Sequence, residues 1–482
     1  MNERALKHVQ IAPLAPARFK EILTDQQSRE LDRTIERAAE LLADRVVWNV
    51  NSTMRGGGVA EMLASLVAYA RGAGVDSRWV VVRGDPDFFR VTKRIHNLLH
   101  GSRGDGGGLG PDARHTYERT CTVAAGELTE LTERGDVVVL HDPQTAGLVA
   151  PLLEDGARVV WRCHVGIDLP NDLARGAWRF LLPYVSPAEA YVFSREAFAW
   201  DDLDRSRVVI IPPSIDAFSA KNQPLDLDTI DAILKAAGIR DGTPAAPAQF
   251  ARQDGSRGRV DRRADLNGTP RLPADVTTVV QVSRWDRLKD HIGVLRAFCA
   301  HVAPETEAHL VLAGPSAAAV SDDPEGAAAL HDVVAARDGC APELRDRVHI
   351  VSLPMVDPEE NAAIVNALQR GATVVAQKSL AEGFGLTVAE AMWKGRPVVA
   401  SAVGGIRDQI SDWETGLLVD ALDLEAFGRA VVALLRDPER AEELGRRARE
   451  HVRGSFLGPR HLAQYVELFG RLLQSTPLPA GR

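Results

Sequence analysis

The chain is poor in cysteine and has no long apolar run. Its four cysteines are scattered over 482 residues, and no two form a Cys-x-x-Cys pair. This argues against a disulfide framework or a zinc site and fits a reducing cytosol. The first 20 residues hold no apolar stretch of signal-peptide length, and no run approaches the roughly 18 apolar residues of a membrane span. We therefore expect a cytoplasmic protein without a membrane segment.

The chain also lacks an excess of basic residues. Its 57 Lys and Arg residues are outnumbered by 66 Asp and Glu residues, for a net charge of -9. Binding of nucleic acid depends on a concentrated basic face, so it is not expected as the main function. A small anionic ligand remains compatible, because it needs only a few local cations. The length allows two to three domains, each with its own core.

Short apolar runs alternate with longer amphipathic segments along most of the chain. The runs are rich in Val and Ile and apolar throughout, which is typical of strands buried on both faces of a parallel sheet. The pattern predicts an α/β fold with two Rossmann-like doubly wound domains that face a cleft. The predicted strands lie at 46–50, 78–82, 136–142, 157–164, 190–193, 207–213, 277–283, 309–314, 348–353, 372–377, 396–401 and 415–420.

The pattern is interrupted once. Residues 241–275 are rich in Pro, Gly, Asp and Arg and poor in large apolar residues, which indicates an exposed linker or polar insertion. The predicted domains are an N-terminal Rossmann-like domain (1–215), a linker with the insertion (216–275), a C-terminal Rossmann-like domain (276–455) and a tail (456–482). The tail is expected to form a helix that packs back on the N-terminal domain.

Unusual polar residues follow the strands, where ligands bind in open α/β sheets. In the first half, a Gly-rich turn at 56–58 joins a strand to a helix and could bring backbone N–H groups to a ligand, or be a tight turn alone. His141 with Asp142, and His164, end two later strands. A lone histidine at a strand end is more often structural than functional, but two strand ends that each carry one favour a functional role more strongly.

In the second half, Arg284 and Lys289 flank a strand-to-helix turn. They could clamp a diphosphate, with Arg as a fork and Lys as a point charge, or belong to a solvated loop. Glu382 precedes a Gly-Phe-Gly loop, where its carboxylate could accept hydrogen bonds from sugar hydroxyls. Glu390 stands in an otherwise apolar helix, which favours a ligand contact over a surface position.

The combined motifs resemble the retaining GT-B glycosyltransferases of family 4, and more closely the trehalose glycosyltransferring synthases. The specific feature is Glu-x7-Glu with Gly-Phe-Gly, preceded by Ser-Arg-x4-Lys and the N-terminal Gly-rich turn. The resemblance covers about residues 46–455. The stretches that carry it are VNSTMRGGGVAEML (50–63), FFRVTKRIHNLLHG (88–101), HDPQTAGL (141–148), WRCH (161–164), DDPEG (322–326) and EGFGLTVAEAMWKGRPVVASAVGGI (382–406).

The resemblance implies a role for each matching residue. His164, Arg284, Lys289 and Glu382 would act at the reacting centre, with the two cations on the diphosphate. The donor sugar and nucleotide would also contact Gly56, Gly57, Gly383, Phe384, Gly385 and Leu386, and Glu390 would hold the ribose. The acceptor would lie beside Asp142 and in a pocket shaped by Lys93, His96 and Asn97.

The implied reaction is reversible transfer of glucose, with retention of configuration, from ADP-, UDP- or GDP-glucose to glucose, giving trehalose. Trehalose phosphorylase activity, another acceptor in family 4, and a silent sugar-nucleotide sensor are the alternatives. No cofactor is expected to take part in the chemistry, although Mg²⁺ could accompany the diphosphate. No metal site is expected, since proline separates the acids of the nearest Asp-x-Asp motif, Asp85 and Asp87. The resemblance also implies a homodimer.

Overall fold

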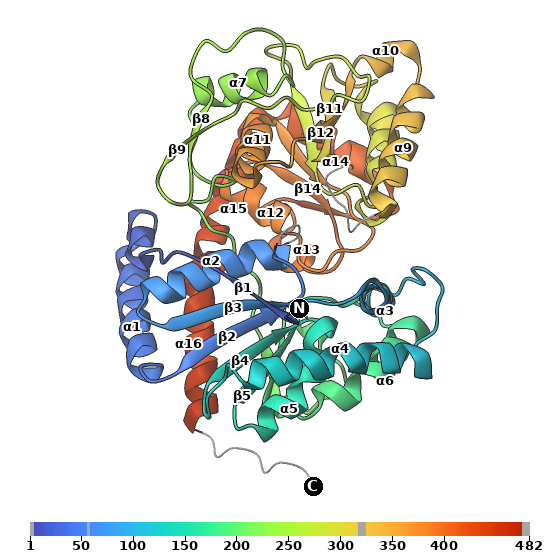
Figure 1. Cartoon of the computed structure of the whole chain (residues 1–482). Coiled ribbons are helices and arrows are strands. Elements are labelled where there is room, and N and C mark those ends of the chain that lie inside the picture. Colours follow the sequence, from blue (N-terminus) through green and yellow to red (C-terminus); the bar gives the residue numbers. More distant parts are fainter. Residues whose placement is uncertain (1–3, 55–57, 317–323, 475–482) are drawn as a thin grey trace. The chain divides into compact units, whose positions relative to one another are not determined.

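The chain folds into two compact units. A computed structural model describes residues 4–54, 58–316 and 324–474. Unit 1 comprises residues 1–214 and 456–482, and unit 2 comprises residues 215–455 (Figure 1). Both have a mixed α/β architecture built on a mainly parallel sheet. No helix in the described part is long and apolar enough to cross a membrane.

Unit 1 contains a seven-stranded sheet in the described part of the chain, in the order β1-β3-β2-β4-β5-β6-β7. Strands β2 to β7 are parallel, and β1 pairs with β3 in the antiparallel sense at one edge. The strands are β1 (Leu6–Val9), β2 (Val46–Asn51), β3 (Asp76–Val82), β4 (Val137–His141), β5 (Arg158–Cys163), β6 (Ala190–Phe193) and β7 (Val208–Ile210).

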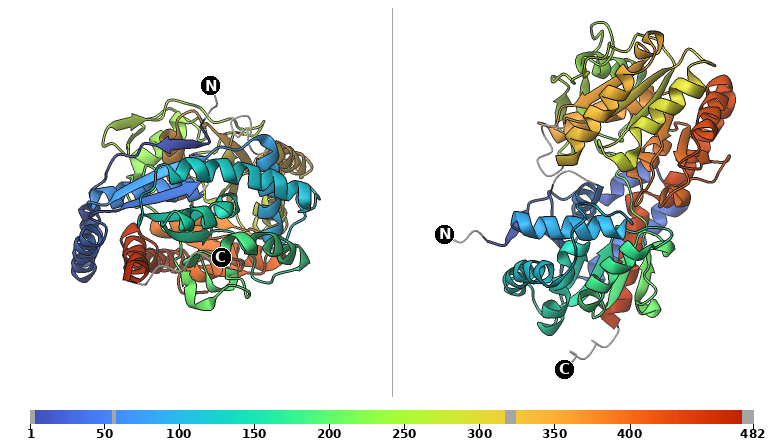
Figure 2. Two further views of the ribbon diagram at one scale, coloured as in Figure 1. Left: turned by 60° about the horizontal axis from the view of Figure 1, so that its bottom comes forward. Right: turned by 90° about the vertical axis from the view of Figure 1, so that its right-hand side faces the viewer.

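Helices cover both faces of this sheet, which explains the continuous apolar runs. In β4, Val138 and Leu140 belong to the core under α3, α4 and α6, whereas Val137 and Val139 belong to the core under α1 and α16. Helices α1 and α16 lie side by side (Figure 1 and Figure 2). The helices are α1 (Asp25–Leu41), α2 (Gly58–Gly72), α3 (Pro86–Leu99), α4 (Pro111–Thr129), α5 (Val149–Glu154), α6 (Asp172–Val185) and α16 (Gly458–Gln474).

Unit 2 contains a six-stranded parallel sheet, again within the described residues, in the order β12-β11-β10-β13-β14-β15. Its strands are β10 (Thr278–Val282), β11 (His309–Pro315), β12 (Val348–Leu353), β13 (Val374–Gln377), β14 (Val398–Ser401) and β15 (Leu417–Val419). Its helices are α7 (Leu227–Ala236), α8 (His291–Ala297), α9 (Pro324–Asp338), α10 (Pro342–Arg345), α11 (Pro358–Gly371), α12 (Leu386–Trp393), α13 (Ile406–Gln409), α14 (Leu424–Arg436) and α15 (Pro438–Ser455).

The doubly wound fold class predicted from the sequence is confirmed, and each predicted strand is present with ends shifted by up to three residues. Three strands were not predicted, namely β1 and the hairpin of β8 (Gln249–Ala251) and β9 (Arg257–Arg259). Their residues are largely polar or exposed, so they leave no continuous apolar run of the kind that marks the other strands. Helix α16 forms in the tail and belongs to unit 1.

Residues 241–275, expected to be an exposed linker or a polar insertion, do not form a separate linker between the two units. They belong to unit 2 and contain the β8–β9 hairpin. The segment has few large apolar residues, but Phe250, Val260 and Leu272 are all buried. Residue Asp265 also bridges in the antiparallel sense to Ser352 of β12. We call residues 215–275, which lead into β10, the strap.

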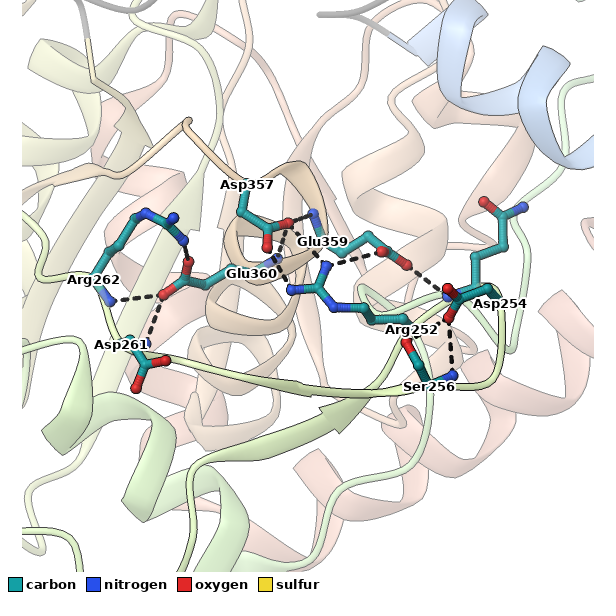
Figure 3. Close-up of polar contacts among 9 residues, drawn as sticks. Arg252, Asp254, Ser256, Asp261, Arg262, Asp357, Glu359 and Glu360 are labelled. Carbon is teal, nitrogen blue, oxygen red and sulfur yellow. Dashed lines mark hydrogen bonds and ion pairs between the residues drawn. The ribbon is translucent and has the colours of Figure 1, made fainter. Parts of the chain in front are cut away.

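Ion pairs hold the strap on the first turn of α11 (Figure 3). Arg252 contacts Asp357 at 2.5 Å and Glu359 at 3.1 Å, and the Arg252 guanidinium lowers the pKa of Asp357 to about 2. Glu360 is buried, accepts from the backbone N–H groups of residues 261 and 262 at 2.7 Å, and pairs with the Arg262 side chain. Composition could not show these contacts, because the acids come from a segment about 100 residues away.

We expect Arg262→Ala to lower the free energy of unfolding by about 1–3 kcal/mol, because it leaves the buried Glu360 carboxylate without its cation. The matched control is Arg259→Ala, in the same hairpin. Arg259 pairs with Asp261, but both side chains are more than 60% exposed, so the change should stay within about 0.5 kcal/mol. Urea unfolding monitored by circular dichroism measures both. Equal losses in the two variants would contradict a specific role for Arg262.

Candidate functional site

The carboxyl ends of β4 and β5 bring two histidines into contact in unit 1. His141 ends β4, and His164 follows β5, its neighbour in the sheet. Their rings are stacked with centroids 5.4 Å apart, and His141 Nδ1 lies 3.1 Å from His164 Nε2. From the sequence, the role of each histidine stayed open between structural and functional, and the parallel register of β4 and β5 brings the two together in one group.

Both rings are held neutral. Burial lowers the pKa of His141 and of His164 well below the usual value, and the Arg162 cation lowers each further. One ring must then donate an N–H to the other. His141 Nε2 is buried without a hydrogen-bond partner among the described residues, whereas the His164 side chain is partly exposed. His164 is therefore the member of the pair that a ligand can reach.

Arg162 is a fully buried cation in β5 that the tail helix supports. Its guanidinium contacts the Tyr465 hydroxyl, and it lies 3.0 Å from His461 Nε2 and 3.1 Å from the Ile211 carbonyl oxygen. Ser214 Oγ in turn lies 2.7 Å from His461 Nδ1. The sequence placed Arg162 within a motif but did not indicate that His461 and Tyr465 contact it, because they lie about 300 residues further along the chain.

Asp142 is held in a strained conformation beside the histidines. Its φ is +66°, a left-handed value that is uncommon for a residue other than glycine and is concentrated at functional sites. Its carboxylate accepts from the His164 backbone N–H at 2.7 Å, and its own N–H donates to the Arg162 carbonyl at 2.7 Å. Burial raises the pKa of Asp142 to about 7. Tertiary contacts therefore fix the position of this carboxylate.

The residues predicted to shape the acceptor pocket lie on one stretch of α3. Lys93 is exposed, while His96 and Asn97 are half-buried, and the spacing of three and four residues puts all three on one face of the helix. The His96 ring packs edge-on against His100 with centroids 4.9 Å apart. Helix α3 packs against the turn that follows Asp142. The acceptor role of these residues stays a prediction.

The predicted glycines at 56 and 57 fall outside the described residues. Helix α2 begins directly after them, at Gly58. Their role in contacting the donor therefore also stays a prediction.

In unit 2, the predicted phosphate cation and the predicted sugar carboxylate contact one another. Lys289 Nζ donates to Glu382 Oε2 at 2.6 Å, and the two side chains are only 15% and 10% exposed. Ser379 Oγ donates to the same oxygen at 3.1 Å. The Arg284 side chain is instead 48% exposed, and its guanidinium lies 3.9 Å from Asp286. Lys289 and Glu382 are thus brought together in one contact.

The loop after Glu382 requires two glycines from another part of the chain. Gly405 N–H donates to the Gly383 carbonyl at 3.0 Å. A Cβ added to Gly404 would lie 1.7 Å from the Glu382 carbonyl oxygen, so only glycine fits there. Gly385, with φ +85°, directly precedes α12. The remaining predicted donor contacts are Phe384, which is buried, and Leu386, which is the first residue of α12.

Glu390 is not a surface residue. It lies on α12 and is 2% exposed. Its Oε1 lies 3.5 Å from Lys221 Nζ, and its Oε2 has no hydrogen-bond partner in the described part of the chain. A buried carboxylate oxygen without a donor is unfavourable unless a ligand supplies one.

Two residues that support the loop around Lys289 were not predicted from the sequence. Gln281, in β10, donates to the Lys289 carbonyl at 2.8 Å and accepts from the Lys378 backbone N–H at 3.0 Å. The Lys378 side chain is 1% exposed and pairs with Asp290. Together these contacts tie the loop that carries Lys289 to the end of β13. Their position could have indicated them, because each is a polar residue within or directly after a buried strand.

Comparison with known families identifies both halves of the chain. Residues 49–200 match the family described as trehalose synthase, N-terminal domain, and residues 266–451 match glycosyl transferases group 1. The trehalose synthase of Rubrobacter xylanophilus is 36% identical over 448 residues, which cover 92% of this chain and 95% of that protein. The trehalose phosphorylase of Pleurotus pulmonarius is 26% identical and matches 87% of this chain but only 56% of its own length.

Solved structures show the same fold. A chain described as trehalose-6-phosphate from E. coli bound with UDP-2-fluoro glucose aligns with a TM-score of 0.66, covering 90% of this chain and 100% of that one. The sequences are 12% identical, so the likeness concerns the fold alone.

We expect Asp142→Asn to stabilise the protein increasingly as the pH rises. The folded-state pKa of about 7 lies above the unfolded value of about 3.9. Ionising this carboxyl therefore costs stability as the pH rises from about 4 to 7, and the asparagine, which can still accept from His164, avoids that cost. Unfolding midpoints at pH 5 and pH 8 measure the effect. The control is Asp155→Asn, an exposed position. A difference from wild type that is the same at both pH values would contradict the raised pKa.

Proposed function

Since the chain belongs to the trehalose synthase family of GT-B glycosyltransferases, we propose that it makes α,α-trehalose from a nucleoside-diphosphate glucose and free glucose. The glucosyl group keeps its α configuration in this proposal. The 36% identity to a trehalose synthase extends over 92% of the chain, so it includes both units.

The contact between Lys289 and Glu382 is the observation in the structure that carries the proposal. It places a cation and a carboxylate 2.6 Å apart. In the proposed reaction the bond from the glucose C1 to the diphosphate oxygen breaks, so negative charge grows on the diphosphate. Lys289 stabilises that charge, and Glu382 accepts hydrogen bonds from glucose hydroxyls and fixes the ring. Two of the three ammonium hydrogens of Lys289 remain for phosphate oxygens.

The acceptor hydroxyl attacks C1 from the side that the diphosphate leaves, and its proton passes to a diphosphate oxygen. This route needs no nucleophile from the enzyme. The neutral His164 ring can donate a hydrogen bond to the donor sugar. The Asp142 carboxyl, whose pKa is about 7, can bind a hydroxyl of the acceptor glucose. Lys93, His96 and Asn97 are proposed to line the acceptor pocket.

Trehalose phosphorylase is the second candidate, supported by the 26% identity to the Pleurotus enzyme. Its identity is lower and its match covers about half of that protein. The unpartnered Glu390 oxygen favours a nucleotide, because a phosphorylase substrate contains no ribose.

The finer features of the proposal concern the donor and the assembly. ADP-, UDP- and GDP-glucose are the proposed donors, Mg²⁺ is an optional companion of the diphosphate, and a homodimer is proposed from the family resemblance. A cytoplasmic location is proposed because the few, scattered cysteines fit a reducing compartment.

One assay distinguishes the candidate functions. The protein is incubated with each of the three nucleotide-glucoses plus glucose, and in parallel with trehalose plus phosphate, and the products are separated by chromatography. Trehalose with free nucleotide supports the proposal. Glucose 1-phosphate from the second mixture identifies a phosphorylase, and no product in either mixture indicates a sugar-nucleotide sensor.

We expect Lys289→Ala to lower kcat about 100- to 1000-fold, since one preorganised charge contact contributes about 3 kcal/mol to the transition state. The matched control is Arg287→Ala, on the same turn. The Arg287 side chain is 81% exposed and pairs with Asp332 at 3.3 Å, so its removal should change kcat less than twofold. Steady-state release of nucleotide measures both variants. Unchanged turnover in Lys289→Ala would reject the diphosphate contact.

A further inference from the structure

The two carboxylate oxygens of Glu390 differ in their surroundings, since one lies beside a lysine and the other has no hydrogen-bond partner among the described residues. Its Oε1 lies 3.5 Å from Lys221 Nζ, and the two side chains are 3% and 17% exposed. Its Oε2 is buried and has no hydrogen-bond partner in the part of the chain that the structure describes. A carboxylate in this arrangement can accept charge-assisted hydrogen bonds from hydroxyl groups of a ligand.

A buried charge is strongly unfavourable unless a group of opposite charge faces it. Lys394, one turn further along the helix, directs its ammonium elsewhere. It contacts Asn222 Oδ1 at 3.0 Å, Gln369 Oε1 at 2.7 Å and the Glu390 backbone carbonyl at 3.2 Å. Burial also lowers the pKa of Lys394 well below its usual value. Lys221 is therefore the cation that faces the carboxylate itself.

Helix α11 fixes the part of the strap that contains Lys221. Asn366 of α11 donates to the carbonyls of residues 220 and 223 at 3.1 and 2.9 Å. Arg370, one turn later, donates to the carbonyls of residues 222 and 223 at 2.9 Å. The backbone on both sides of Lys221 is thus bound to α11, so the position of its ammonium is set by the fold of unit 2.

We propose that Lys221 is a positioning residue for the ribose of the nucleotide donor. Its ammonium group lies against Oε1 and leaves Oε2 to accept hydrogen bonds from the ribose 2′- and 3′-hydroxyls. The inference rests on the proposed function, in which Glu390 contacts the ribose. The segment that composition marks as a linker then supplies part of the donor site.

Binding of ribose and 2′-deoxyribose nucleotides tests this role. The dissociation constants of ADP, UDP and GDP and of their 2′-deoxy forms are measured by calorimetry with the full chain. We expect the wild type to prefer the ribose form on the order of tenfold, the effect of one hydrogen bond to a charged group. Lys221→Met should bring this ratio close to one and raise KM for the nucleotide-glucose with little change in kcat. Lys221→Arg should keep the ratio.

The matched control is Lys235→Met, also in the strap. The Lys235 side chain is 18% exposed and pairs with Asp231 at 2.7 Å, so it equals Lys221 in burial and in having a carboxylate partner. The Lys235→Met variant should keep the preference for the ribose form. Glu390→Gln should remove the preference, and adding Lys221→Met to it should cause no further loss, because both changes act on one contact.

Each result has one meaning. If Lys221→Met weakens ribose and deoxyribose nucleotides equally, or leaves the ratio unchanged while Glu390→Gln removes it, the role of Lys221 is rejected and the proposed function stands. If Glu390→Gln leaves the ratio intact, the ribose contact itself is rejected, and the role of Lys221 with it. If the wild type binds none of these nucleotides, the proposed function fails as well.

Discussion

The burial of charged groups at the carboxyl ends of parallel strands is the constraint on which the rest of this structure depends. A buried charge is strongly unfavourable unless an opposite charge or several hydrogen bonds compensate it. In unit 1, Arg162 is compensated by the Ile211 carbonyl, just after β7, and by side chains of α16. In unit 2, Lys289 is compensated by Glu382, and Glu390 by Lys221. Each functional group therefore needs a supporting segment, and these segments lie far from it in the chain.

The strap shows how far this requirement extends. Its second part, residues 241–275, has the composition of a loop, yet Arg252 and Arg262 of that part pair with the acidic start of α11. Its first part contributes Lys221 to the candidate donor site. The same helix holds the backbone around Lys221 through Asn366 and Arg370. A segment that contacts one helix at so many points, and that buries apolar residues such as Ile233 and Phe250, is a structural part of the unit.

The tail has a comparable role in unit 1. Helix α16 packs beside α1 and sends His461 and Tyr465 to the Arg162 guanidinium. That cation lies in the strand that ends next to His164, and its charge contributes to the low pKa of both histidines. The chemistry of the histidine pair thus depends on the last helix of the chain, which reaches unit 1 after the whole of unit 2 has been traversed.

The sequence by itself determined the doubly wound architecture, since strands buried on both faces leave continuous apolar runs that need no partner to be recognised. It also determined which residues follow the strands, among them His164 and Glu382, because the polar residues break those runs. Only the tertiary structure decided what these groups contact. The pairing of Lys289 with Glu382, of Glu390 with Lys221, and of His141 with His164 joins side chains 23 to 169 positions apart. Such contacts depend on strand order and helix packing in three dimensions, and no local pattern of residue types records them.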